Sequence, residues 1–193
     1  MTTEIVCSGY GGQGVLTTGI LLASMGHKSG HKVTWYPSYG TEMRGGTANC
    51  NVKLSDMEIG SPYCKKPKIL IAMNEPALDR FESSIKPGGY LFVNASLTPA
   101  DRIYREDINV VLVDMEALAK SAGNPKGGNI SMLGVLANIT GQFDQEAARN
   151  AITNYFESKG KGQFNALNVA AFDAGFKAVD NGSFCTVRAC AEK

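Results

Sequence analysis

The sequence has almost no excess of charge of either sign. Its 19 lysine and arginine residues oppose 18 aspartate and glutamate residues, which gives a formal net charge of +1. Proteins that bind nucleic acid through its phosphates carry a clustered excess of positive charge. We therefore expect no nucleic-acid partner.

Long apolar runs are missing as well. No stretch approaches the roughly 20 apolar residues that a membrane-spanning helix needs, and the N-terminus lacks the basic segment and apolar core of a secretion signal. These absences predict a cytoplasmic protein that makes no contact with a membrane.

Metal-binding patterns are scarce. The five cysteines include no C-x-x-C pair, and their spacing fits neither a zinc site nor the four closely spaced thiolates of an iron–sulfur cluster. We expect buried free thiols, so any electron-transfer centre would belong to another chain. The two histidines, His27 and His31, have no nearby carboxylate or cysteine to complete a metal site. The cysteines are Cys7, Cys50, Cys64, Cys185 and Cys190.

The sequence also offers no arrangement of groups that would break covalent bonds. It contains neither the G-x-S-x-G turn of α/β-hydrolases nor the H-E-x-x-H motif of zinc proteases. Neither histidine has a partner with which to activate a nucleophile. This pattern indicates a chain that contacts a ligand and depends on other chains for its chemistry.

A glycine-rich turn is the most informative feature that is present. Residues 9–14, G-Y-G-G-Q-G, lie between a strand-like run at 5–7 and a helix-like run at 15–25. Glycines at the first, third and sixth positions allow a tight turn and close approach of a phosphate to the backbone, and the start of the following helix favours an anion. The candidate ligand-binding residues in the turn are Gly9, Gly11, Gly12, Gln13 and Gly14.

A second glycine-rich segment follows the second predicted strand, 32–36, which we expect Pro37 to end. Residues 37–46, P-S-Y-G-T-E-M-R-G-G, lack periodicity and predict a loop. The loop should emerge at the same carboxyl edge of the sheet as the glycine turn, where open α/β sheets bind ligands. Its arginine suits a phosphate, a carboxylate or an acidic group of a partner, or else pairs with Glu42. The candidate residues are Ser38, Tyr39, Arg44, Gly45 and Gly46.

The acidic residue of a dinucleotide site is absent. In that fold an Asp or Glu at the end of the second strand binds the ribose hydroxyls, whereas here the strand ends Thr34-Trp35-Tyr36. This absence favours a phosphate ligand other than NAD, or a turn that serves packing alone. A free-standing protein that binds NAD or FAD remains an alternative, as does a scaffold subunit without a small ligand.

The remaining sequence alternates strands with helices. The order predicts a single α/β domain over residues 1–193: a three-layer sandwich around a mainly parallel sheet, with an inserted β-hairpin and a Rossmann-like first β-α-β unit. The tail from about residue 181 fits no pattern that we can interpret. The expected strands are 47–54 with its hairpin mate 57–59, then 69–73, 90–93 and 109–113, and the expected helices are 76–84, 115–122, 130–139, 144–156 and 165–179.

The two glycine motifs taken together resemble the gamma subunit of the 2-oxoacid:ferredoxin oxidoreductases. The resemblance covers roughly residues 4–180, including I-L-I-A-M-N at 69–74 and N-I-S-M-L-G at 129–134. The S-Y-G-T-E-M-R-G-G loop is more similar to the 2-oxoglutarate and 2-ketoisovalerate members than to the indolepyruvate members. It does not identify the 2-oxoacid substrate, which could also be pyruvate.

This resemblance implies a division of labour between subunits. Members of the family oxidatively decarboxylate a 2-oxoacid to acyl-coenzyme A and pass electrons to ferredoxin. Thiamine diphosphate, its magnesium ion and the iron–sulfur clusters would be bound by alpha, beta and ferredoxin-like partner subunits of a heterotetramer. This chain alone would bind no cofactor. The gamma subunit would contribute assembly contacts and part of the site for coenzyme A, a substrate, near the turn at 9–14.

Overall fold

The computed structural model describes residues 1–39, 47–180 and 185–186. Within these ranges the strands form one sheet in the order β2-β3-β1-β4-β5-β6-β7. All strands run in one direction except β3 and β7, which oppose their neighbours. The strands are β1 Thr2–Tyr10, β2 Lys32–Tyr39, β3 Thr47–Ser55, β4 Ile69–Ala72, β5 Tyr90–Asn94, β6 Asn109–Val113 and β7 Cys185–Thr186.

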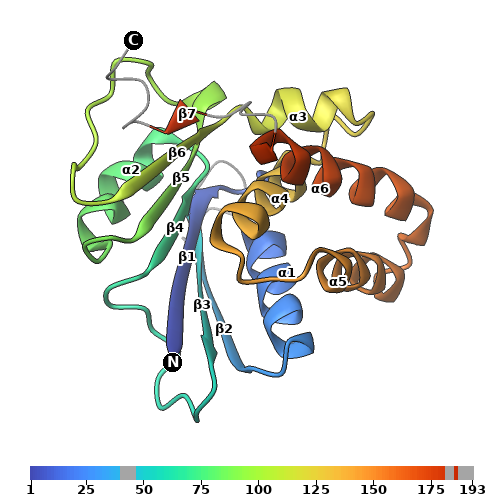
Figure 1. Ribbon diagram of the computed structural model, residues 1–193, viewed down its shortest axis with the longest axis horizontal. Helices are drawn as coiled ribbons and strands as arrows, with labels where there is room; N and C mark the ends of the chain where they lie inside the picture. Colours follow the sequence, from blue (N-terminus) through green and yellow to red (C-terminus); the bar gives the residue numbers. More distant parts are fainter. Residues whose placement is uncertain (40–46, 181–184, 187–193) are drawn as a thin grey trace.

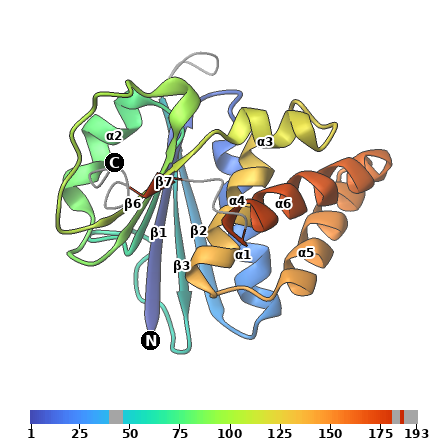
Figure 2. The ribbon, with the colours of Figure 1, turned by 45° about the horizontal axis from the view of Figure 1, so that its top comes forward.

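Helices cover both faces of this sheet, so the predicted three-layer sandwich is confirmed. Helix α2 lies on one face, and α1, α3, α4, α5 and α6 lie on the other (Figures 1 and 2). Among the described residues, no helix is both long and apolar enough to cross a membrane. The helices are α1 Val15–Lys28, α2 Glu75–Phe81, α3 Met115–Ser121, α4 Gly128–Thr140, α5 Gln145–Ser158 and α6 Asn165–Asp180, with short 3-10 turns η1 Glu82–Ser84, η2 Ala95–Leu97 and η3 Gly162–Phe164.

The central strands are buried on both faces because helices cover both sides. All four residues of β4 are buried, and they alternate between two apolar clusters. Ile69 and Ile71 pack in the cluster beneath α1 and α4, whereas Leu70 and Ala72 pack beside α2. A continuous apolar run is what a parallel strand between two helical layers requires.

The β-hairpin differs in detail from the sequence-based expectation. Strand β3 pairs with β2, and the predicted mate 57–59 is not a strand. Pro37 does not end β2, which continues to Tyr39 with Pro37 opposite Cys50. Strand β2 is at the edge of the sheet, where the missing N–H of a proline costs no bond to an outer neighbour.

The first β-α-β unit departs from a dinucleotide-binding fold in one respect. Strands β1 and β2 point the same way, but β3 lies between them and is antiparallel to both. The end of β2 is therefore one strand further from the glycine turn than in that fold. The strand that carries the ribose-binding acid of NAD enzymes is thus displaced here.

Helices α4 and α6 approach closely enough for their backbones to touch. A Cβ atom at Gly134 of α4 would collide with the carbonyl oxygen of Phe172, and one at Gly175 of α6 would collide with the carbonyl oxygen of Ser131. Neither carbonyl can move independently of its helix. The two glycines therefore fix the spacing of α4 and α6, whose first turns both reach the carboxyl edge of the sheet.

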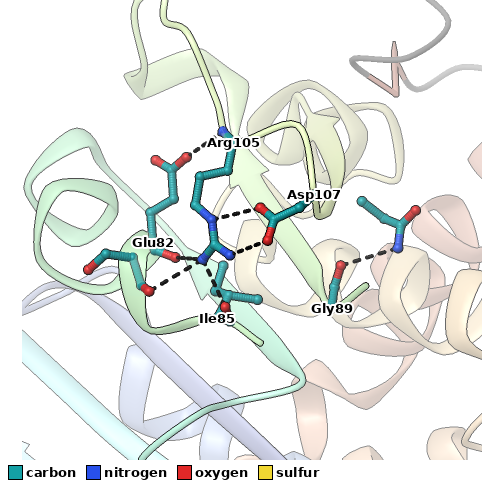
Figure 3. Close-up of polar contacts among 7 residues, drawn as sticks. Glu82, Ile85, Gly89, Arg105 and Asp107 are labelled. Atoms are coloured by element: carbon teal, nitrogen blue, oxygen red, sulfur yellow. Dashed lines mark hydrogen bonds and ion pairs between the residues drawn. The ribbon is translucent and has the colours of Figure 1, made fainter. Parts of the chain in front are cut away.

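On the other face, Arg105 fastens the connection between β5 and β6 to the end of η1 (Figure 3). Its Nη1 donates to the backbone carbonyl oxygens of Glu82 and Ile85 at 3.0 and 2.8 Å. Its Nε and Nη2 donate to the two carboxylate oxygens of Asp107 at 2.9 and 2.6 Å. The bonds to Asp107 hold the pKa of its carboxyl group below the ordinary value, and the bonds to the carbonyl oxygens attach Arg105 to the backbone at the end of η1.

Candidate functional site

The glycine turn places the start of α1 at the carboxyl edge of the sheet. The first bond of the helix runs from the Thr18 N–H to the Gly14 carbonyl oxygen at 2.8 Å, so the preceding three amide groups have no acceptor within the helix. Among the described residues no side chain caps this end, and the first turn contains no acidic residue. These unpaired N–H groups and the helix dipole make the end of α1 favourable for an anion.

Three of the glycines have distinct roles in this turn. A Cβ at Gly9 would lie 2.6 Å from the Gln13 Oε1 atom and 2.9 Å from the Met73 Cβ atom, so a side chain does not fit. Gly14 has a φ of +78° and faces the Asn129 side chain. Gly12 has a φ of +100°, and no described atom lies within 4 Å of its Cβ position. Its backbone is therefore open to a ligand.

A network of side-chain amides ties the turn to the ends of the next strands. Gln13 Oε1 accepts from the Tyr10 N–H at 2.6 Å and from Asn74 Nδ2 at 3.0 Å, and Gln13 Nε2 donates to the Met73 carbonyl oxygen at 3.0 Å. Asn94 Nδ2 donates to the same oxygen at 3.3 Å and to Glu116 Oε1 at 3.1 Å. The network spans the carboxyl ends of β1, β4 and β5 and fixes the orientation of the turn. Gln13 thus positions the backbone of the site.

A groove of about 960 Å³ opens beside the turn on the α1 side of the sheet. Its polar wall comes from the glycine turn, the first turn of α3, the 123–128 connection and the first turn of α4, whereas its apolar wall comes from α5, η3 and α6. A smaller cavity of about 320 Å³ lies at the opposite edge, beside Thr3 and Ile69. The larger groove is at the edge where open α/β sheets bind ligands.

Two polar atoms in the groove are buried and lack a hydrogen-bond partner among the described residues. One is Glu116 Oε2, an acceptor, and the other is Asn168 Nδ2, a donor. Buried polar atoms of this kind are rare because the lost hydration is costly. Both residues line the groove, so these two atoms are unsatisfied polar groups within its wall.

The candidate residues of the second glycine motif are only partly described. Tyr39, the last residue of β2, is opposite Ala48, next to the Tyr10–Thr47 pair, so β1 and β2 end at the same edge as predicted. Ser38 is in register with Asn49 and, through it, with Ser8, on the sheet face away from α1. Arg44, Gly45 and Gly46 lie outside the described residues.

Sequence reasoning missed most of the groove. Asn74 caps the start of α2, with Oδ1 accepting from the Ala77 N–H at 3.0 Å, and it was not among the candidate site residues. Asn94, Glu116 and Asn168 were not expected to contribute. The sequence does mark Asn74 and Asn94, because each comes at the end of an apolar run typical of a buried strand. These runs are I-L-I-A-M-N and Y-L-F-V-N.

Cys7, Cys50 and Cys64 are free thiols, as expected. Cys7 and Cys50 are buried and face each other across β1 and β3, and Cys64 is partly buried. Burial raises the pKa of the Cys64 thiol to about 12, so it is protonated and unreactive at neutral pH. In the described ranges, no three His, Cys, Asp or Glu side chains come together as a metal site.

The chain is thus an α/β protein with a groove at the edge of the sheet where the parallel strands have their carboxyl ends. Residues 4–178 match the model of the pyruvate ferredoxin/flavodoxin oxidoreductase family. The chain belongs to this family.

The chain is similar to individual subunits of oxoacid oxidoreductases. The chain is 37% identical over 174 residues to the ketoisovalerate oxidoreductase subunit VorA of Methanothermobacter marburgensis, covering 89% of this chain and 35% of that one, so it spans about a third of that relative. It is similar to the gamma subunit of a keto/oxoacid ferredoxin oxidoreductase from Geobacter sulfurreducens, with a TM-score of 0.78, 28% identity and coverage of 92% and 95%. The resemblance to gamma subunits is confirmed.

A further solved structure has the same fold within a larger chain. It is a 2-oxoglutarate:ferredoxin oxidoreductase from Magnetococcus marinus with 2-oxoglutarate, coenzyme A and succinyl-CoA bound. The TM-score is 0.78 at 23% identity, and the match covers 92% of this chain and 31% of that one. At this identity the likeness shows the shared fold alone.

Proposed function

We propose that the chain is the gamma subunit of a multi-subunit 2-oxoacid:ferredoxin oxidoreductase, which converts a 2-oxoacid to acyl-coenzyme A by oxidative decarboxylation. In this complex it contributes assembly contacts and part of the coenzyme A site. Family membership and the similarity to a gamma subunit over 92% of the chain support this assignment.

The remaining chemistry belongs to partner subunits. Alpha, beta and ferredoxin-like chains hold thiamine diphosphate, magnesium and the iron–sulfur clusters, and ferredoxin accepts the electrons. The cysteine spacing of this chain, which lacks any C-x-x-C pair, supports that division. The 2-oxoacid is recognised mainly by those partners, and the relatives named above act on ketoisovalerate and 2-oxoglutarate.

One observation carries the coenzyme A assignment: the uncapped start of α1 opens onto the groove beside the exposed backbone of Gly12. Coenzyme A carries a diphosphate and a 3′-phosphate, and backbone N–H groups at a helix start suit either. The unpaired Glu116 Oε2 atom accepts a hydrogen bond from a ligand hydroxyl or amide N–H, which coenzyme A also supplies.

Replacing Gly12 by aspartate is expected to raise the KM for coenzyme A in the assembled enzyme at least about tenfold, because a carboxylate would face the phosphate. The complex should still assemble, since no described atom obstructs a side chain at this position. Steady-state kinetics over a range of coenzyme A concentrations, with size-exclusion chromatography of the complex, measures both properties.

Gly30→Asp is the matched control. Gly30 also has a positive φ, +86°, and no described atom within 4 Å of its Cβ position, but it lies in the turn after α1, at the other end of the helix. It imposes a similar backbone cost without a charge in the groove. An unchanged KM in an intact Gly12→Asp complex would leave a scaffold role only, and a chain that purifies without thiamine-dependent partners would refute the assignment altogether.

A further inference from the structure

The start of α4 forms a second uncapped helix end in the same groove. No described side chain caps it at Gly127, and its first turn contains no acidic residue. Lys126 comes directly before this cap and lines the groove together with Gly128 and Asn129. The position thus combines a helix dipole, free backbone N–H groups and a cation.

The two helix starts lie side by side. Asn129, in the first turn of α4, donates from Nδ2 to the Thr18 hydroxyl at 3.4 Å and approaches the Gly14 carbonyl oxygen at 3.5 Å. A Cβ at Gly14 would lie 2.7 Å from the Asn129 side chain. A ligand seated on the end of α1 therefore has the end of α4 within reach.

An unsatisfied donor lies at the same end of the groove. Asn168, only 5% exposed, accepts from Asn124 Nδ2 through its Oδ1 atom at 2.9 Å, but its own Nδ2 atom has no partner in the described ranges. Asn124 in turn adjoins the helix cap, because a Cβ at Gly127 would lie 2.7 Å from Asn124 Nδ2. A buried N–H donor with no acceptor is satisfied when a ligand oxygen occupies the groove.

We propose that Lys126, the first turn of α4 and Asn168 form a second phosphate subsite, which binds a further phosphate of the ligand held by the start of α1. That the ligand is coenzyme A rests on the proposed function. The subsite itself requires only a molecule that carries two phosphate groups.

The test is a titration of the full-length ¹⁵N-labelled chain, followed by NMR, with coenzyme A and separately with inorganic pyrophosphate. With either probe, the amide signals of Gly12 and Gly14 and those of Gly128 and Asn129 should shift with one common Kd. Lys126→Ala should raise that Kd about five- to tenfold, the usual effect of losing one charge-assisted contact. Asn168→Asp, which replaces the donor by a carboxylate, should raise it further.

Lys177→Ala is the matched control, because Lys177 is an exposed lysine on the last turn of α6, away from the groove. Shifts confined to the α1 turn, with equal affinity for Lys126→Ala and the unmodified chain, would overturn the second subsite. If pyrophosphate shifts both sets of amides and coenzyme A shifts neither, the subsite stands and the coenzyme A assignment fails. If neither probe binds, the second subsite and the coenzyme A assignment both fail.

Discussion

Replacing Gly175 by alanine is expected to lower the free energy of unfolding by about 3 kcal/mol or more, at the upper end of overpacking effects. The added methyl group would overlap the Ser131 carbonyl oxygen of α4, which belongs to a helix backbone and has no rotamer to change. Helices α4 and α6 must separate to accommodate it, so apolar contacts along both are lost. Urea denaturation followed by circular dichroism measures the change.

Gly60→Ala provides the control for this variant. Gly60 does not have a positive φ, and no described atom lies within 4 Å of its Cβ position, so alanine should change stability by less than about 0.5 kcal/mol. Gly134→Ala, on the opposite side of the contact, should reproduce the Gly175→Ala effect. Equal denaturation midpoints for Gly175→Ala and Gly60→Ala would contradict the close backbone contact.

The same substitution should weaken ligand binding in the fraction that remains folded. The first turn of α4 and Asn168 of α6 both line the groove. They belong to the two helices that the added methyl group would separate. A displacement of about 1 Å is enough to lose hydrogen bonds whose length range is narrow. The Kd for pyrophosphate of the folded variant is the relevant measurement.

Replacing Arg105 by alanine is expected to cost about 2–4 kcal/mol of stability. The guanidinium bonds to several backbone carbonyl oxygens and to both oxygens of Asp107, and each lost bond is worth roughly 1 kcal/mol. Without it the connection between β5 and β6 loses its attachment to η1. Thermal and urea unfolding of the two proteins would show the loss.

Arg80→Ala serves as the control, because Arg80 is an exposed arginine of α2 whose described contact is with the Phe81 ring at 5.2 Å, worth about 0.5–1 kcal/mol. A pH series adds a second readout. The pKa of Asp107 is lowered in the folded chain from its ordinary value of 3.8, so its contribution is present above that pH and is lost as the pH falls through the lower folded value. Arg105→Ala should abolish this part of the acid dependence of stability. An unchanged dependence of stability on pH would contradict the ion pair between Arg105 and Asp107.

The features that were predictable from the sequence depend on local patterns. The strand, glycine turn and helix at residues 2–28 follow from residue types within one short window, as do the starts of the helices that follow Asn74 and Asp144. The helices from α3 to α6 begin and end within a few residues of the expected bounds because glycine, proline and capping residues mark their ends.

The features that local sequence patterns did not predict depend on contacts between residues that are distant in the sequence. The short run 57–59 has the residue types of a strand, but β3 finds its partner in β2, on the other side of the glycine-rich loop. Pro37 ends a strand only where both strand edges are paired, and edge position is a property of the whole sheet. Lys126 and Asn168 become neighbours of the glycine turn only through packing of α4 and α6, so no local pattern marks them.

The glycine turn has its fixed shape only when distant segments are already in place. Gln13 bonds to the Met73 carbonyl oxygen, 60 positions away, and Asn129 reaches Gly14 across 115 positions. Contacts between such distant residues form late, because long loops must first be closed at an entropic cost. Helix α1 can form early on the growing chain, whereas the groove needs residues as far along as Asn168. During synthesis, therefore, the glycine motif emerges long before it can bind, and the groove becomes competent for its ligand only after residue 168 has emerged.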